Sequence, residues 1–443
     1  MEGKFMKTKS LLLLGASLSV LALGIAGCGN GSKDKEADSA DGKTKISFTW
    51  WGAEVRHEKY IKAIEAFEKE NPDIDVDYEY AAWDDYWKKL ATKSAAGELP
   101  DVMQMDGSYL AQYGQKNQLA DLTEFTGEGK TIDTTNIDPS IIDSGKLDDK
   151  FFAIAPAVNA MSMITNQALV DKAGASVDYE NYNFEDWVAS IEKVKQETGE
   201  YGMIDVVDNY VLLQYYLRTQ GEELLKYNDE GKPELAFSKE NFITFMNAIG
   251  KLAKEEAIPT AEVASNIKSF DENPLSLGKV AYYQNWNNQF VTYTQSAADG
   301  VDLSLNLPYS AKDGALFYRP SFFYSVAQTS KNKEAAAKFA NFLVNDEEAN
   351  KIIGTERGIP ASTVAKDTIY EDMTDEEKVA SDYLDKIADY VGEASPVLPV
   401  GFSELNTHFK DVFAEITYGT MTAEEAYDSY VAKAEEIFDE NYD

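Results

Sequence analysis

Apolar residues alternate with smaller or polar residues at the start of the folded region. Ile46, Phe48 and Trp50 follow this alternation until Gly52 interrupts it, which predicts a strand that ends in a loop. Residues 60–67 then carry apolar side chains at helical spacing up to Asn71-Pro72, so we expect a helix there. Residues 74–80 alternate again, residues 83–96 indicate a helix closed by Gly97, and residues 99–103 indicate a short third strand.

Strands separated by single helices predict a parallel α/β layer. Ligands of such sheets bind in the crevice beyond the carboxyl ends of the strands. This rule gathers aromatic and polar side chains from three loops at one rim of the sheet. They are Trp50, Trp51, Glu54 and Arg56 after the first strand, Trp83 and Asp84 after the second, and Asp106 after the third.

A second α/β stretch follows Pro156. The pattern predicts a strand over residues 158–164, helices over 184–198 and 242–257, and a strand over 278–283 that leads to Trp286. An alanine-rich amphipathic helix is expected over 334–343, and helical patterns follow over 374–390, 404–416 and 422–438. No internal repeat of 20–50 residues is present. The alternation of strands and helices therefore continues through most of the chain.

The N-terminus has the pattern of an export signal. Lys4, Lys7 and Lys9 precede an apolar run from Leu11 to Ala26, which is shorter than the roughly 20 residues of a membrane-spanning helix. The single cysteine, Cys28, follows Ile25-Ala26-Gly27 and resembles the lipidated cysteine of a bacterial lipobox; the alternative is a plain cysteine in an ordinary signal peptide. We expect a signal peptide over residues 1–27 and, over 28–45, a palmitate-type lipid anchor on Cys28 followed by a flexible tether.

Composition narrows the function further. The chain has 443 residues, with 41 Lys and Arg against 77 Asp and Glu, so its formal charge is −36. Such a surface repels a phosphate backbone, so we expect no nucleic-acid partner. With one cysteine and two histidines, an intrachain disulfide, a CxxC pair and a zinc knuckle are excluded. No cofactor or metal is expected.

Several short motifs resemble bacterial family 1 extracellular solute-binding proteins, the carbohydrate-binding lipoproteins of ABC importers. Leu99-Pro100-Asp101-Val102 followed by Leu119-Ala120-Asp121-Leu122 is similar to the first-lobe signature of that family. The segment 278–281 leading to Trp286, the segment 329–336 with its SKNKEAA sequence, and Arg357-Gly358-Ile359-Pro360 resemble later family motifs in the same order. Many members have Gly-Gly where this chain has residues 319–324, a loop that often faces the ligand.

The resemblance implies a two-lobe α/β fold of the type II, maltose-binding-protein-like class, with hinge strands and a cleft between the lobes. It assigns residues 46–157 plus 307–360 to one lobe and 158–306 plus 361–443 to the other, with crossings at Pro156 and Leu307-Pro308. It also implies a monomer anchored by lipid to the extracytoplasmic side of the cell membrane. Such a protein captures a sugar, here an oligosaccharide, and delivers it to the transmembrane permease subunits of an ABC importer.

The residue types themselves also favour a sugar ligand. A pyranose has apolar C–H faces that pack on flat aromatic rings, and hydroxyl groups that carboxylates, amides and arginines bind. Trp50 is expected in the core and Trp51 on the opposite side of the same strand. For Asn159 and Arg357, a structural role is the alternative to ligand contact. The resemblance contributes Trp286, and Tyr324 and Asn209 follow from loop position. The candidate ligand contacts are Trp51, Glu54, Arg56, Trp83, Asp84, Asp106, Asn159, Asn209, Trp286, Asn287, Tyr324 and Arg357.

Two other functions stay open at this stage. A secreted glycosidase needs two facing carboxylates roughly 5–10 Å apart, and the many acids near the predicted rims leave that possibility. However, the chain has no GxSxG, HExxH or Walker sequence, and the family resemblance favours binding without turnover. A metal site is less favoured. The spacing of Asp73, Asp75 and Asp77 is similar to the start of a calcium-binding loop, but Tyr78 occupies the position where that loop requires glycine.

Overall fold

The computed structural model describes residues 42–442 except 148, 205–208 and 268. The predicted signal peptide and Cys28 lie outside these described residues. Among the described residues, no helix has the length and apolar character needed to cross a membrane.

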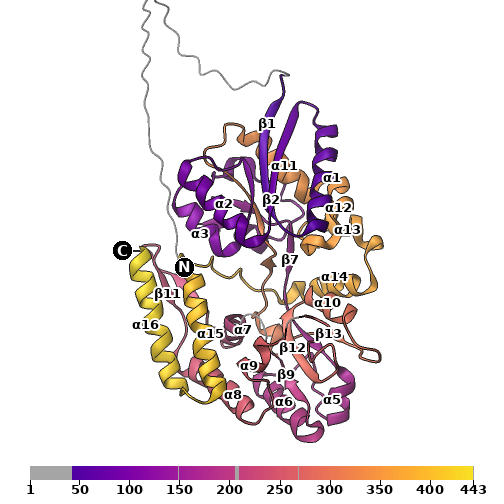
Figure 1. The fold of residues 1–443 in the computed structure, drawn as a ribbon, viewed down its shortest axis with the longest axis vertical. Helices are drawn as coiled ribbons and strands as arrows, with labels where there is room; N and C mark the ends of the chain where they lie inside the picture. Colours follow the sequence, from indigo (N-terminus) through magenta and orange to yellow (C-terminus); the bar gives the residue numbers. More distant parts are fainter. Residues whose placement is uncertain (1–41, 148, 205–208, 268, 443) are drawn as a thin grey trace, which may run out of the picture. The chain divides into compact units, whose positions relative to one another are not determined.

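A sheet with the strand order β2–β1–β3–β15–β6 forms the centre of the first lobe (Figure 1). β1 is parallel to β2 and to β3, as the alternation of strands and helices predicts. β15 comes from a distant part of the chain and runs antiparallel to β3 and β6. The strands are β1 (Thr44–Trp51), β2 (Ile74–Ala81), β3 (Val102–Met105), β6 (Ala153–Ile154) and β15 (Phe323–Val326).

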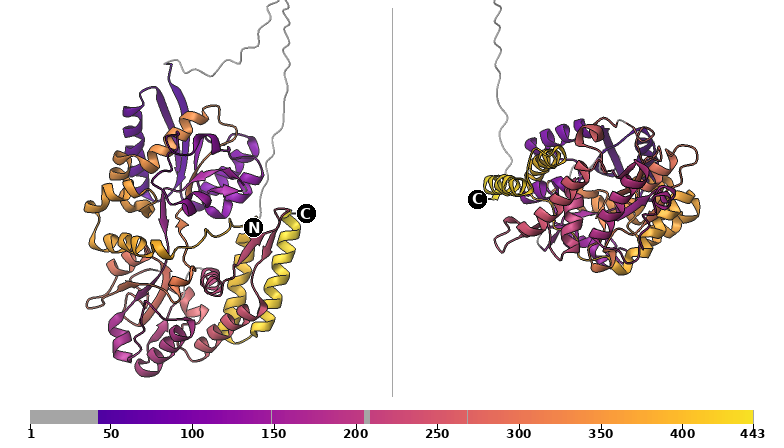
Figure 2. Two further views of the ribbon diagram at one scale, coloured as in Figure 1. Left: turned by 180° about the vertical axis from the view of Figure 1, so that it is seen from behind. Right: turned by 90° about the horizontal axis from the view of Figure 1, so that it is seen from below.

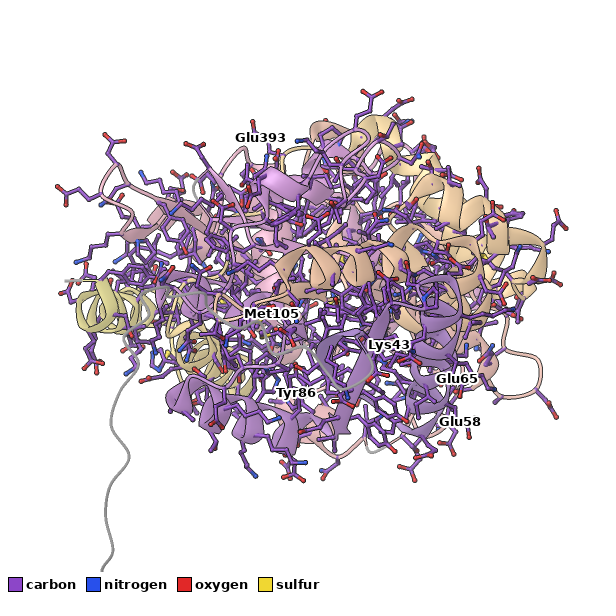
Figure 3. All side chains as sticks on the ribbon, turned by 90° about the horizontal axis from the view of Figure 1, so that it is seen from above. Lys43, Glu58, Glu65, Tyr86, Met105 and Glu393 are labelled. Carbon is purple, nitrogen blue, oxygen red and sulfur yellow. The ribbon has the colours of Figure 1, made fainter. Side chains whose placement is uncertain are left out.

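Helices cover both faces of this sheet (Figures 1 and 2). On one face, Phe48 packs edge-on against Tyr60 and Phe339, with ring centroids 5.6 and 5.2 Å apart, and Trp50 is fully buried beside them. Figure 3 labels the buried side chains of Met105 and Tyr86 and the exposed carboxylate of Glu58. The helices are α1 (Glu54–Glu70), α2 (Trp83–Ala96), α3 (Gly107–Gln115), α4 (Pro139–Asp143), α11 (Lys333–Asn345), α12 (Glu347–Ile353) and α13 (Thr363–Ile369).

Asp101 connects two motifs that lie far apart in the sequence. One carboxylate oxygen accepts hydrogen bonds from the backbone N–H and the hydroxyl of Ser47, both at 2.8 Å, and the other accepts from the hydroxyl of Ser330 at 2.6 Å. Asp101 belongs to the Leu-Pro-Asp-Val motif and Ser330 to the SKNKEAA motif. The two motifs therefore meet at one carboxylate, which joins β1, the start of β3 and the segment before α11.

The second lobe is built around a sheet with the order β13–β8–β12–β9. β12 is antiparallel to β8 and parallel to β9, and β13 is antiparallel to β8. The strands are β8 (Met161–Thr165), β9 (Tyr201–Met203), β12 (Val280–Trp286) and β13 (Ser304–Asn306). A separate hairpin is formed by β10 (Leu225–Tyr227) and β11 (Pro233–Leu235).

The helices of the second lobe include the predicted C-terminal helices. α15 and α16 lie side by side and contact α8 (Figures 1 and 2). α14 begins with a capping box in which Thr374 and Glu377 bond to each other's backbone N–H, and this fixes its start. The helices are α5 (Gln167–Ala173), α6 (Phe184–Thr198), α7 (Asn209–Thr219), α8 (Lys239–Lys254), α9 (Ala261–Ser265), α10 (Gln289–Gln295), α14 (Asp375–Ile387), α15 (Phe402–Tyr418) and α16 (Ala423–Tyr442).

A third, small sheet joins the two lobes. Its strands are β14 (Arg319–Pro320), β7 (Ala157–Asn159) and β16 (Ile359–Pro360), and β7 is antiparallel to both neighbours. We call these three strands the hinge sheet. Gly358, directly before β16, has φ +104°, and a Cβ there would lie 2.8 Å from the Ser321 hydroxyl oxygen. Glycine is therefore required where the chain enters the hinge sheet.

The strand predicted over residues 158–164 is interrupted at Ala160. β7 ends at Asn159 in the hinge sheet and β8 begins at Met161 in the second lobe. The Ala160 N–H donates to the Asn287 side-chain oxygen at 2.9 Å, and the Asn287 N–H donates to the Ala160 carbonyl at 3.0 Å. Because Asn287 satisfies both backbone groups of Ala160, the chain can leave one sheet and enter the next without a buried unpaired amide.

The predicted lobe boundaries stay a prediction, and several contacts favour a different position for two of them. Tyr182 donates to the Leu307 carbonyl at 2.9 Å and Tyr215 donates to the Tyr309 carbonyl at 2.7 Å, so the segment after residue 306 packs with α6 and α7. α13 contacts α11 and α12 of the first lobe. We infer that the second crossing lies at β14 rather than at Leu307-Pro308, and that the first lobe extends beyond residue 360 through α13.

We predict that Asp101→Ala lowers the free energy of unfolding by about 2–3 kcal/mol, because a carboxylate that accepts three hydrogen bonds is lost and the N–H of the half-buried Ser47 in β1 loses its acceptor. Urea unfolding followed by circular dichroism measures the change. Asp85→Ala is the matched control, since that side chain is 70% exposed, and its stability should stay within about 0.5 kcal/mol of wild type. Equal stability of the two variants would contradict the structural role of Asp101.

Candidate functional site

A polar cavity of about 530 Å³ lies between the two lobes against the hinge sheet. Its volume is in the range of small-molecule binding sites. The first lobe and the hinge contribute Trp51, Arg56, Trp83, Asp106, Asn159, Arg319, Pro320, Ser321, Phe322, Thr355, Glu356, Arg357, Gly358 and Ile359 to its wall. The second lobe contributes Trp286, Asn288, Gln289, Val291, Thr292, Glu377 and Ala380.

Aromatic rings form a corner on the first-lobe side. Trp51 ends β1 and Trp83 begins α2, and their rings are perpendicular with centroids 4.9 Å apart. Phe322 packs edge-on against Trp51 at 5.7 Å. Trp83 is 41% exposed, so part of its ring is open to the solvent. Two perpendicular indole rings can contact a face and an edge of one sugar ring.

Trp286 supplies an aromatic surface from the second lobe. It is the last residue of β12 and is half-buried. The Arg319 guanidinium lies 4.7 Å from the centroid of its indole ring, a cation–π arrangement, and Phe317 packs edge-on at 6.0 Å. Trp286 lines the cavity, so part of its ring surface is accessible from the cavity.

Arg56 and Glu356 form a charged pair in the cavity wall. The Arg56 Nε lies 2.9 Å from both carboxylate oxygens of Glu356, and its Nη1 donates to the Trp51 carbonyl at 3.2 Å. The guanidinium also lies over the Phe322 ring at 5.4 Å. Each group is mostly buried, with 16% and 19% of the side chains exposed. The pair therefore fixes the position of the aromatic corner relative to the hinge.

The floor of the cavity is the hinge sheet itself. The Asn159 side-chain nitrogen donates to the Ser321 hydroxyl at 3.1 Å, and the Asn159 Oδ1 is buried without a hydrogen-bond partner in the described part of the chain. Asn159 comes from β7, Ser321 follows β14 and Gly358 precedes β16. Any change of hinge conformation therefore alters the floor of the cavity.

The carboxylates of the cavity wall are engaged in local hydrogen bonds. Asp106 caps α3 by accepting from the backbone N–H and hydroxyl of Ser108. Glu377 of the second lobe accepts from the hydroxyl of Thr355 in the first lobe and from the backbone N–H of Thr374 at 2.8 Å. The Thr355–Glu377 hydrogen bond connects the two lobes at the edge of the cavity.

The structure brings seven of the predicted ligand contacts together: Trp51, Arg56, Trp83, Asp106, Asn159, Trp286 and Arg357 all line this cavity. Glu54 and Asp84 lie in the exposed first turns of α1 and α2, and Asn209 begins α7. These three residues do not line it. Whether the seven residues bind a ligand stays a prediction.

Two predicted contacts have structural roles instead. Asn287 is fully buried and bonds to Ala160 and, at 2.9 Å, to the Ala380 carbonyl. Tyr324 is also fully buried, with its hydroxyl 2.6 Å from the Tyr60 hydroxyl and accepting from Arg357 at 2.9 Å. The polar groups of both side chains are occupied by the protein, so neither is available at the cavity surface.

The sequence did not single out several wall residues. The loop 319–324 is predicted to face the ligand through Tyr324, but the structure places Arg319 and Phe322 of this loop in the wall instead. Glu356 lies just before β16 and Glu377 in α14, and folding brings both to one wall with Arg56, which is 300 residues from Glu356. The one available signal was that arginine is scarce: three of the four arginines in the chain, Arg56, Arg319 and Arg357, line this cavity.

Two lobes joined by a hinge sheet, with an aromatic and polar cavity between them, define a solute-binding protein. This chain belongs to the bacterial extracellular solute-binding protein family, whose family model matches residues 62–436.

Individual relatives agree with this family. The chain is 31% identical over 176 residues to a carbohydrate ABC transporter substrate-binding protein of Streptococcus pneumoniae TIGR4, covering 38% of this chain and 35% of that relative. It is 23% identical over 373 residues to the maltooligosaccharide ABC transporter solute-binding lipoprotein of S. pneumoniae R6, with 83% of each chain covered. Among solved structures, a family 1 extracellular solute-binding protein from Alicyclobacillus acidocaldarius matches with a TM-score of 0.73 and 27% identity, over 90% of this chain and 100% of that chain.

A periplasmic oligogalacturonide-binding protein from Yersinia enterocolitica shares the fold, with a TM-score of 0.77, 23% identity, and coverage of 90% and 100%. At this identity the similarity concerns the fold alone.

His57 lies directly beside the cavity residue Arg56. Its ring is 7% exposed, its Nδ1 accepts a hydrogen bond from the Trp50 Nε1–H at 3.1 Å, and it stacks on Tyr80 with centroids 3.9 Å apart. Burial lowers the pKa of His57 most, Arg56 lowers it further, and Glu54 and Glu356 partly offset this. A proton on Nδ1 would also remove the acceptor for Trp50.

We predict that acid destabilises the protein through His57. Because the folded-state pKa lies below the unfolded value of about 6.5, the unfolded chain binds the proton more readily, so the stabilising contribution is present above pH 6.5 and falls as the pH drops below it. Urea unfolding at pH 7.5, 6.5 and 5.5 should show a stability difference between wild type and His57→Gln that shrinks toward low pH. His408→Gln should behave like wild type, and a pH-independent difference for His57→Gln would refute the role of His57.

Proposed function

We propose that this protein is the extracytoplasmic substrate-binding component of an ABC importer that captures a neutral oligosaccharide by lobe closure and delivers it to the membrane permease. The observation that carries this proposal is the interlobe cavity with indole rings on both sides: Trp51 and Trp83 from one lobe and Trp286 from the other. A sugar held between them would contact both lobes, so the closed state would bind it more tightly than the open state.

The charges of the wall favour an uncharged ligand. The described wall contains three arginines and three acidic residues, so its formal charge is zero. The residues are Arg56, Arg319 and Arg357, and Asp106, Glu356 and Glu377. The whole chain has a formal net charge of −36. This charge repels an anionic ligand over the Debye length of about 8 Å at physiological salt. Hydroxyl groups can bind both guanidinium and carboxylate groups, whereas an acidic sugar would meet carboxylates in the wall as well as a repelling surface.

A glycosidase is the less favoured alternative. Its mechanism needs one carboxylate as an acid and a second one facing it. Glu356 is held by Arg56, Glu377 by Thr355 and Thr374, and Asp106 by Ser108. Carboxylates held in this way support a rigid wall rather than proton transfer, which favours binding without turnover.

The cellular location is part of the same proposal. A signal peptide over residues 1–27 and lipidation of Cys28 would anchor a monomer at the extracytoplasmic face of the membrane, where the permease receives the sugar. The S. pneumoniae maltooligosaccharide relative is described as a lipoprotein, which supports the lipid anchor on Cys28. Labelling of the expressed protein with a radioactive or alkyne-tagged fatty acid tests the anchor, and loss of the label in Cys28→Ser is the expected result.

Ligand class is tested by calorimetry and thermal unfolding with neutral oligosaccharides and with uronic-acid oligosaccharides of matched length. We expect a neutral series to raise the unfolding temperature and the uronates to have little effect, because a ligand at 100 times its Kd stabilises by about 2.7 kcal/mol. Chromatography of the mixtures should show no cleavage products. Preferential uronate binding would refute the neutral class, and release of monosaccharide would refute binding without turnover.

We predict that Trp286→Ala weakens sugar binding by about 1–3 kcal/mol, because a buried aromatic contact with the sugar is lost. The unfolding temperature without ligand should change little, since the indole is half-buried. Isothermal titration calorimetry measures the affinity. Tyr418→Ala is the control, because that ring is 49% exposed on α15 and does not line the cavity; unchanged affinity of Trp286→Ala would remove this residue from the site.

A further inference from the structure

A second cavity of about 270 Å³ adjoins the first one. The two cavities share a short stretch of wall that consists of Asp106, Trp286, Arg319, Pro320 and Ser321. The stacked pair of Trp286 and Arg319 therefore borders both spaces. A ligand that lies on Trp286 in the first cavity is next to the opening of the second.

Both lobes form the wall of the second cavity. The first lobe contributes the start of α3 and Phe323. The second lobe contributes Tyr210 and Gln214 of α7 and the segment 395–398, followed by Phe402, Ser403 and Asn406 at the start of α15. A molecule in this space would contact both lobes, as one in the first cavity would.

The chemistry of this wall differs from that of the first cavity. Among the described residues, Asp106 and Arg319 are the charged ones that line it, and both are shared with the first cavity. The other side chains of this wall are aromatic or aliphatic, or they carry a hydroxyl or an amide group. Tyr210 and Phe402 pack edge-on with centroids 5.0 Å apart, and Gln214 donates to the Ser395 hydroxyl at 3.1 Å.

Asn406 adds an unused acceptor to this wall. Its Oδ1 is buried and accepts no hydrogen bond from the described part of the chain. A buried acceptor without a donor costs free energy, which a ligand hydroxyl or a bound water can recover. Aromatic surface, uncharged hydrogen-bonding groups and an unused acceptor together match a neutral sugar ring.

We propose that the binding site continues past Trp286 into the second cavity, which holds a further neutral sugar unit of the ligand, and that residues 395–406 determine the length of oligosaccharide accepted. This proposal rests on the proposed function. Since a unit in the second cavity touches both lobes, it strengthens the preference of the ligand for the closed state. Affinity should therefore rise with chain length until the second cavity is filled, and then level off.

The test uses neutral gluco- and galactooligosaccharides of one to six units, titrated by calorimetry into the full chain. Ser403→Tyr narrows the second cavity, because Ser403 is exposed on the first turn of α15 and lines that cavity but not the first. Thr407→Tyr is the matched control, because it adds the same ring one turn further along α15 at an exposed position that lines neither cavity. Unfolding temperatures without ligand check that both variants fold.

We expect the wild type to bind the longer oligosaccharides of each series more tightly than the shortest one that binds. Ser403→Tyr should weaken the longer members about tenfold while changing the shortest binding member less than about twofold, and Thr407→Tyr should match wild type. Affinity that does not depend on length, or an equal loss at every length in Ser403→Tyr, overturns the extension while leaving sugar binding intact. If wild type binds no member of either series or of the wider neutral panel, the proposed function itself fails. The length series on wild type alone tests the proposal even if a variant does not fold.

Discussion

The arrangement of the site depends on how the chain leaves one sheet and enters another at Ala160. β7 belongs to the hinge sheet and β8 to the second lobe, and a single residue separates them. Both backbone groups of that residue bond to Asn287, and Asn287 also bonds to the Ala380 carbonyl of α14. One buried amide thus connects the crossing, the end of β12 and α14. Since Trp286 directly precedes Asn287, the same hydrogen bonds hold the aromatic surface of the second lobe against the hinge.

The hinge sheet makes the cavity sensitive to lobe movement. Asn159, Ser321 and Gly358 each belong to or adjoin a different hinge strand, and all of them line the cavity floor. The Thr355–Glu377 hydrogen bond joins the lobes at the edge of the cavity. A ligand that fills the space between the indole rings would act on the same strands that allow the lobes to move. This explains in physical terms how binding could be converted into a change that a partner recognises.

The balance of acidic and basic residues differs between the whole chain and the cavity wall. The chain has an excess of acids and only four arginines, yet three of them line one cavity beside three carboxylates. Arginine has a planar group that can bond a carboxylate, a carbonyl and an aromatic face at the same time, and Arg56 makes all three contacts. A lysine could not hold Glu356, the Trp51 carbonyl and Phe322 together in this way. The arginines therefore organise the wall, while the acidic exterior sets the net charge.

Local patterns in the sequence were sufficient for several of the elements and for part of the site. Alternation and helical spacing located β1, β2, α1 and α2, and the rule for parallel sheets placed Trp51, Arg56, Trp83 and Asp106 at one rim, where the structure has them. These features depend on neighbouring residues, so the sequence alone determined them. The tertiary structure decided the rest: that Asn287 and Tyr324 use their polar groups inside the protein, that Glu356 and Glu377 join the wall, and that residues 395–406 border a second cavity. Those outcomes depend on which distant segments meet, and a hydrogen-bond partner hundreds of residues away leaves no local pattern.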